Sequence, residues 1–199
     1  MRLGILGGSF NPVHRGHLSL AKFAFSELNL DRLYFVPSCQ PPLKSAKDLL
    51  PPALRLRLLE KATKSYPQFQ VSDCEIKRGG KSYTVDTLKY FRQKYGKTAR
   101  IYFIAGMDAL ENIARWKSPE KIFKLCRFVA ATRPGHSARK TEYPVTILPF
   151  EALEISSSEI RKRLKAGKSV DSLAPEEILA DLKKFKKGEL TSKPKKRLS

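Results

Sequence analysis

Short apolar runs alternate along the chain with segments whose apolar residues recur every three or four positions. The apolar runs predict buried strands at 3–6, 32–36, 100–105, 127–132 and 145–148, and residues 68–76 are expected to be extended. The helical spacing predicts helices at 16–28, 54–62, 85–91, 156–166 and 175–185. Strands that alternate with helices favour parallel pairing, so the pattern predicts an α/β fold with a mainly parallel sheet.

A turn rich in glycine and proline, residues 7–17, follows the first predicted strand with the sequence GGSFNPVHRGH. Glycine lets backbone N–H groups approach a ligand closely, and the helix that follows begins with N–H groups that favour an anion. His14 and His17 are three residues apart, so their imidazoles are expected to point the same way. The turn therefore predicts a phosphate site, although its glycines match neither G-x-G-x-x-G nor the P-loop.

The charge of the chain is strongly positive, at +20 over 199 residues, and its last seventeen residues are especially rich in lysine. A basic surface attracts anionic partners, and phosphorylated small molecules and nucleic acid both fit this description. The length suits one domain. We expect that domain at 1–187, including the C-terminal helices, and a disordered basic tail at 188–199 that is compatible with a secondary nucleic acid contact.

Three classes of protein are disfavoured by the composition. No run approaches the roughly 18–20 apolar residues of a membrane span, and the apolar start is too short for a signal peptide. The three cysteines are scattered, without the spacing of a metal site or a disulfide framework. We therefore expect reduced thiols in a cytoplasmic protein without membrane contact.

Five motifs in order carry a resemblance to a known family. Residues 7–17 are similar to the signature of the H-x-G-H nucleotidyltransferase superfamily. Within it the chain resembles the bacterial nicotinate-nucleotide adenylyltransferases over about residues 1–166, through the segments PSCQPPLK (37–44), RGGKSYTVDTL (78–88), IAGMDAL (104–110) with Trp116, and ISSSEIR (155–161).

The resemblance implies a fold, a reaction and a cofactor. The fold is α/β, Rossmann-like and doubly wound, with a mainly parallel sheet and helices on both faces. The reaction transfers AMP from ATP to nicotinate mononucleotide, giving nicotinate adenine dinucleotide and pyrophosphate in NAD biosynthesis. Mg²⁺ would be bound through the ATP phosphates, and the sequence offers no protein cage for a metal.

The resemblance also implies where ATP binds. His14 and His17 would be the catalytic residues and hydrogen-bond the triphosphate, with His17 at the α-phosphate. The other ATP-binding residues would be Gly8, Ser9 and Phe10 through their N–H groups, Gly106, Asp108, and a second anion site of Ser156, Ser157, Ser158 and Arg161. The alternatives are an N-cap role for Asp108, and a plain capping box, Ser156-x-x-Glu159, with a solvated Arg161.

The mononucleotide would bind to Lys44, Ser82, Tyr83, Thr84 and Trp116, with Trp116 stacking on the pyridine ring. A solvated Lys44 and a Trp116 packed in the core are the alternatives. The family's Pro-Pro-His-Lys loop is Pro-Pro-Leu-Lys here, and Leu43 can neither donate a hydrogen bond nor carry charge. Any contact made by that histidine is absent or supplied elsewhere.

Other functions stay open on the sequence. Within the superfamily, the acceptor of the AMP group is alternatively nicotinamide mononucleotide or pantetheine phosphate. In a different class, the basic charge fits a nucleic-acid-binding module, although no RNA-binding motif with stacked aromatics stands out. The sequence also leaves a homo-oligomer open.

Overall fold

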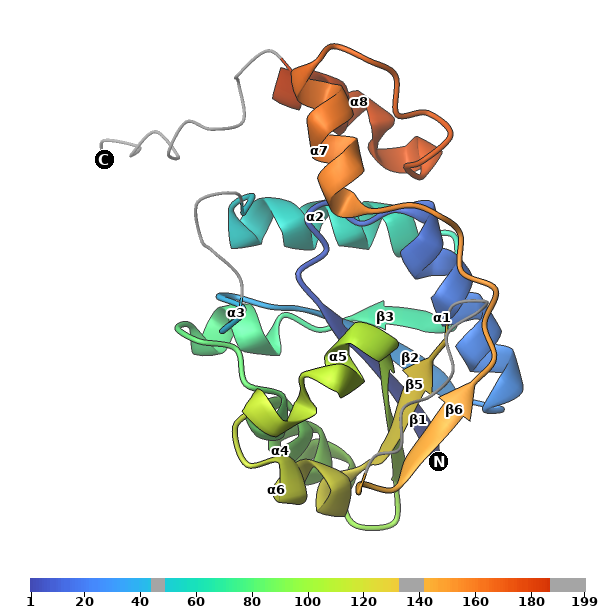
Figure 1. Ribbon diagram of the computed structural model, residues 1–199, viewed down its shortest axis with the longest axis vertical. Coiled ribbons are helices and arrows are strands. Elements are labelled where there is room, and N and C mark those ends of the chain that lie inside the picture. The colour runs from blue at the N-terminus through green and yellow to red at the C-terminus, as the bar shows by residue number, and fades with distance from the viewer. Residues whose placement is uncertain (44–48, 133–141, 187–199) are drawn as a thin grey trace.

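The sheet is the centre of the fold. The computed structural model describes residues 1–43, 49–132 and 142–186. All the strands pair in parallel in one six-stranded sheet of order β3-β2-β1-β4-β5-β6, which confirms the predicted fold class (Figure 1). The strands are β1 (Arg2–Gly8), β2 (Arg32–Pro37), β3 (Phe69–Val71), β4 (Arg100–Gly106), β5 (Arg127–Ala131) and β6 (Val145–Leu148).

The strand order reverses direction at β1 and β4, which are neighbours although almost 100 positions separate them in the chain. Ligands in such sheets bind beyond the carboxyl ends of the strands at this switch point. Here Gly8 and Gly106 end the two strands. The turn at 7–17 and the segment after 106 therefore lie at the same edge of the sheet, as predicted.

Helices cover both faces of the sheet. One face packs against α1 (Arg15–Glu27) and α2 (Pro52–Thr63), and α7 (Ser157–Lys165) and α8 (Glu176–Lys186) extend the same apolar core beyond α2. The other packs against α4 (Thr84–Tyr95), α5 (Met107–Glu111) and α6 (Pro119–Leu125), with the short α3 (Cys74–Arg78) beside it. Side chains alternate along a strand, so Ile5 joins one core and Leu6 the other.

The C-terminal helices stack over α2, as Figure 1 shows at the top of the molecule. Asp181 of α8 pairs with Lys61 of α2 at 2.7 Å, and Arg57 lies 3.6 Å from the same carboxylate. The predicted domain boundary at 187 and the basic tail at 188–199 lie outside the described residues.

Two sequence expectations need correction. The extended segment at 68–76 is wrong in its second half, because β3 ends at Val71 and residues 74–78 form α3, which ends at Gly79 with a φ of 72°. The capping box at Ser156 forms only in part. The Ser156 hydroxyl accepts from the N–H of Glu159, but the Glu159 carboxylate pairs with Arg163 at 2.8 Å instead.

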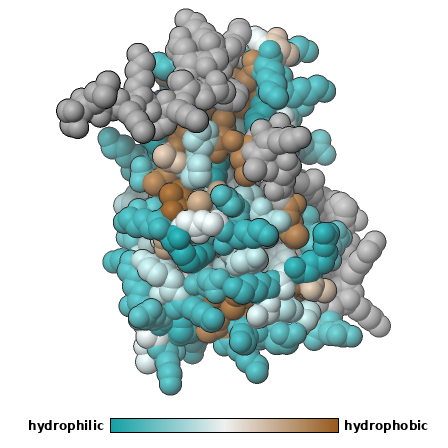
Figure 2. Space-filling view, turned by 90° about the vertical axis from the view of Figure 1, so that its left-hand side faces the viewer, coloured by the Kyte–Doolittle hydropathy of each residue, from teal (hydrophilic) through white to brown (hydrophobic). Residues whose placement is uncertain are grey.

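The surface in Figure 2 is mostly hydrophilic, with apolar side chains gathered in its upper half. Leu43 and Leu153 are among the few large apolar side chains that are about half exposed, and both line the cavity described below. Each helix in the described part of the chain is too short or too polar to cross a bilayer.

Candidate active site

One large cavity, about 1050 Å³ in volume, lies at the carboxyl edge of the sheet. The predicted site residues within the described ranges all line it, with the exception of Phe10. Lys44 lies outside the described residues. The cavity therefore brings together segments that are up to about 150 positions apart in the chain.

Phe10 packs against the predicted phosphate-binding turn at residues 7–17, which is called the phosphate turn below. Its side chain is buried, and its ring packs edge-on against Phe35 and against His17, with the His17 centroid at 5.0 Å. A Cβ on Gly8 would come within 3.1 Å of the Phe10 ring. Glycine at this position therefore allows the ring to pack directly beneath the turn and to support His17.

The two histidines begin α1, as predicted, with His14 as the N-cap and His17 in the first turn. Their rings lie 3.6 Å apart, and the backbone N–H of His14 donates to Nδ1 of His17 at 3.2 Å. Since Nδ1 is an acceptor in this arrangement, the proton of a neutral His17 ring sits on Nε2. His17 therefore offers an N–H donor at the other end of its ring.

His14 is a neutral group at physiological pH. It is only 7% exposed, and this burial lowers its pKa to about 4. A neutral imidazole can still donate one hydrogen bond to a phosphate oxygen, without the cost of burying a charge. His14 therefore lines the cavity as an uncharged hydrogen-bonding ring.

The second predicted anion site is tethered to the phosphate turn. The Ser157 hydroxyl donates to the carbonyl of Pro12 at 2.9 Å, and Nη1 of Arg161 donates to the carbonyl of Asn11 at 2.8 Å. The solvated alternative for Arg161 is therefore wrong. The amino end of α7, where a helix favours an anion, lines the same cavity as the histidines.

Asp108 lies in the first turn of α5 and lines the cavity. The N-cap of this helix is Gly106, so the N-cap alternative for Asp108 is wrong. A Cβ on Gly106 would come within 2.6 Å of a carboxylate oxygen of Asp108, so the carboxylate folds back over Gly106. It remains able to accept hydrogen bonds from a sugar diol.

Residues 82–84 and Trp116, which the sequence predicts to hold the acceptor, also line the cavity, and this part of it is called the acceptor end below. Ser82 joins this segment to the neighbouring loop, because its hydroxyl accepts from the N–H of Cys39 and its own N–H donates to the carbonyl of Gln40, each at 2.8 Å. Tyr83 is the N-cap of α4, and Thr84 is its first residue.

Trp116 packs against the core and also borders the cavity, which are the two positions that the sequence left as alternatives. Its ring packs edge-on against Phe103 and Phe128 of the core, at centroid distances of 6.0 and 6.2 Å. It is only partly buried and also lines the cavity. The core contacts therefore fix the orientation of a ring that a flat ligand can reach.

Arg55 is the main residue that the sequence analysis missed. It is fully buried in α2, and its guanidinium donates to three backbone carbonyls: Ser9 at 2.7 Å, Leu50 at 2.9 Å and Cys39 at 3.0 Å. It thereby connects the phosphate turn to the loop beside the acceptor end. Its only sequence signal is its position on the same helical face as Leu58 and Leu59.

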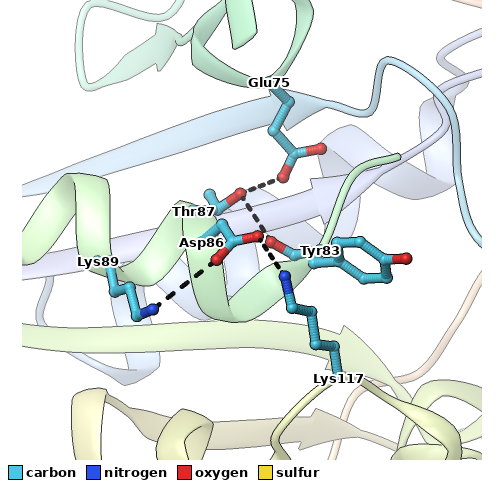
Figure 3. A network of polar contacts seen from close by, with 6 residues as sticks. All are labelled: Glu75, Tyr83, Asp86, Thr87, Lys89 and Lys117. Atoms are coloured by element: carbon cyan, nitrogen blue, oxygen red, sulfur yellow. Dashed lines mark hydrogen bonds and ion pairs between the residues drawn. The ribbon is translucent and has the colours of Figure 1, made fainter. Parts of the chain in front are cut away.

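Glu75 is a second missed residue, at the acceptor end. Its carboxylate is almost fully buried and accepts a hydrogen bond from the Thr87 hydroxyl (Figure 3). Burial raises the pKa of Glu75, and the hydrogen bond from Thr87 opposes this effect.

Within the described ranges, no three histidine, cysteine or carboxylate side chains are grouped to hold a metal ion.

Comparisons with known proteins show the family of the chain. A family model described as cytidylyltransferase-like matches residues 5–163. A protein of Thermoanaerobacter sp. is 39% identical, with 93% of each chain covered, and one of Moorella thermoacetica is 42% identical, with 89% of this chain and 87% of the relative covered. Both are named "Probable nicotinate-nucleotide adenylyltransferase".

A solved structure from Plasmodium falciparum shows the same fold, with a TM-score of 0.76 at 20% identity, over 96% of this chain and 98% of that chain. It is described as a nicotinic acid mononucleotide adenylyltransferase complexed with NaAD. The chain belongs to the cytidylyltransferase-like family and, within it, to the nicotinate-nucleotide adenylyltransferases, which confirms the resemblance of its motifs.

Proposed function

We propose that this protein transfers the AMP group of ATP to the phosphate of nicotinate mononucleotide, with release of pyrophosphate. The observation that supports this most is that one cavity is lined by both groups of predicted site residues. Its one end is lined by the two histidines and the amino end of α7, and its other end by Trp116 and the start of α4. Two nucleotides bound in this way would meet at their phosphates.

The reaction requires no protein nucleophile. An oxygen of the acceptor phosphate, already ionised at neutral pH, attacks the α-phosphorus of ATP and forms the new P–O bond. The bond from the α-phosphorus to the bridging oxygen breaks, and its electron pair leaves with pyrophosphate. Catalysis then consists of alignment and of stabilising the charge that develops.

The roles of the residues follow from this chemistry. His17 would donate from Nε2 to the α-phosphate, and the neutral His14 would donate to the neighbouring phosphates. The N–H groups of residues 8–10 and of the start of α7, together with Arg161, would stabilise the remaining charge. Asp108 would accept from the ribose of ATP, while residues 82–84 and Trp116 would hold the acceptor.

We include Mg²⁺ in the proposal as an ion held mainly by triphosphate oxygens and water. The donor set of the cavity fits this arrangement, because it is rich in N–H and hydroxyl groups and provides Asp108 as an exposed carboxylate. When bound, Mg²⁺ would neutralise charge on the phosphates.

A cytoplasmic location is also part of the proposal, and the three free thiols favour a reducing compartment.

The test is product analysis by mass spectrometry with purified protein, ATP, Mg²⁺ and one acceptor at a time. Nicotinate mononucleotide should give nicotinate adenine dinucleotide and an equal amount of pyrophosphate, at a higher kcat/KM than nicotinamide mononucleotide or pantetheine phosphate. A preference for either of the other acceptors, or no product with any of them, would overturn the proposal.

A further inference from the structure

Lys117 is a cavity residue that no recognised motif includes. It directly follows Trp116 and precedes α6, and it lines the acceptor end of the cavity. Its ammonium lies 3.3 Å from a carboxylate oxygen of Asp86 and 4.5 Å from the centre of the Tyr83 ring. Figure 3 shows that it reaches from a separate segment to the first turn of α4. Its position is therefore held by two contacts.

The charges around Asp86 do not balance. Lys117 and Lys89 approach its carboxylate from different sides, at 3.3 and 3.9 Å (Figure 3). Two ammonium groups share one carboxylate, so the cluster keeps one net positive charge. Lys117 lines the cavity and Lys89 does not, so the ammonium that faces a bound ligand belongs to Lys117.

The other described cations that line the cavity lie elsewhere. Arg161 donates to the carbonyl of Asn11 in the phosphate turn, and Arg115 lies 3.4 Å from the side-chain oxygen of Asn112, next to α5. The nearby Leu43 lines the cavity without any charge. Among the described cations that line the cavity, Lys117 is thus the one that lies over the Tyr83 ring and directly follows Trp116 in the chain.

We propose that Lys117 is a specificity-determining residue that favours an acceptor with a ring carboxylate over one with a ring amide. The inference rests on the proposed function and names the group that distinguishes its acceptors. Both rings present a carbonyl oxygen that backbone N–H groups can bind, but only the carboxylate carries a charge. When a ring carboxylate binds beside Lys117, the site contains two carboxylates, that of the ligand and that of Asp86, and two ammonium groups, those of Lys89 and Lys117. The charges then balance.

The expected effect is moderate, because the side chain of Lys117 is 50% exposed and water screens it. A single charge-assisted hydrogen bond in this setting corresponds to an effect of about tenfold. The effect should appear in KM for the acid acceptor, since the ring carboxylate does not change charge during the reaction.

The experiment measures kcat/KM with nicotinate mononucleotide and with nicotinamide mononucleotide for the wild type, Lys117→Met, Lys117→Glu and Lys89→Met. Lys117→Met should lower the ratio of acid to amide about tenfold, through KM for the acid acceptor, and Lys117→Glu should lower it further. Lys89→Met is the matched control, because it removes the other partner of Asp86 outside the cavity, and its ratio should equal that of the wild type.

Two outcomes would overturn the inference while the proposed function stands. One is an unchanged ratio in Lys117→Met when the wild type is active. The other is an equal loss in Lys89→Met, which would assign the effect to Asp86. A wild type that adenylylates neither acceptor would instead overturn the proposed function, and the inference with it. Thermal unfolding of each variant within about 2 °C of the wild type excludes misfolding as the cause.

Discussion

Two substitutions of His17 can separate its structural role from its proposed catalytic role. His17 uses Nδ1 to accept from the N–H of His14 at 3.2 Å, and its Nε2 is the atom proposed to donate to the α-phosphate. Asparagine places its side-chain oxygen near the position of Nδ1, and glutamine places its amide nitrogen near that of Nε2. His17→Asn therefore keeps the helix cap without the outer donor, and His17→Gln keeps a donor without the cap.

The magnitudes follow from these contacts. Loss of one donor to the charge that develops in the reaction costs roughly 10²–10³ in kcat, so His17→Asn should be slower by this factor. Loss of the capping hydrogen bond costs about 1 kcal/mol, which lowers Tm by about 2–4 °C for a chain of this size. His17→Gln should show this lower Tm and a kcat between those of His17→Asn and the wild type.

The assay combines pyrophosphate release at saturating substrates with thermal unfolding followed by circular dichroism. The expected result is a crossed pattern, in which the more stable variant is the slower enzyme. A kcat for His17→Asn within about threefold of the wild type, well short of the 10²-fold loss of an oxyanion donor, would refute the assigned role. A kcat for His17→Gln no higher than that of His17→Asn would show that the donor at Nε2 is not what the reaction uses.

The remaining predictions concern stability and ATP binding. Burial lowers the pKa of His14 from 6.5 to about 4, so between pH 6.5 and 4 only the unfolded chain binds a proton at this residue. The free energy of unfolding of the wild type should therefore fall as the pH falls through this range, by up to about 3 kcal/mol. Urea unfolding of His14→Gln should show a decrease that is smaller by this amount. Arg55→Met leaves three carbonyls without their donor and should cost about 3 kcal/mol, or about 6–12 °C in Tm, whereas the exposed control Arg57→Met should change stability by less than about 0.5 kcal/mol. The guanidinium of Arg161 has separate N–H groups for the carbonyl of Asn11 and for a phosphate, whereas the single ammonium of Arg161→Lys cannot reach both in the same geometry. The KM for ATP of this variant should therefore rise about tenfold in steady-state assays. An unchanged KM would contradict a role of Arg161 in binding phosphate.

The sequence predicted the parts of the molecule that depend on local chemistry. The alternation of apolar runs with helical spacing was enough for the sheet and most helices, since each pattern reflects one buried face. The pairing of His14 with His17 also follows from their spacing within one helical turn. α3, α5 and α6 were missed because five to seven residues are too few for a helical period to stand out.

The parts that the sequence did not predict depend on contacts between distant segments. The donors of Arg55 go to carbonyls of separate loops, and every residue type has a carbonyl, so no motif marks its partners. The tether from Ser157 to Pro12 spans 145 positions. Lys117 resembles any surface lysine until the fold brings it to Asp86, 31 positions earlier in the chain.

A crystal structure of the protein with a non-hydrolysable ATP analogue would locate the triphosphate. We expect the triphosphate to lie between the His17 ring and the amino end of α7, with Nε2 of His17 within hydrogen-bond distance of an α-phosphate oxygen. A triphosphate bound away from both elements, or at the acceptor end beside Trp116, would contradict this expectation.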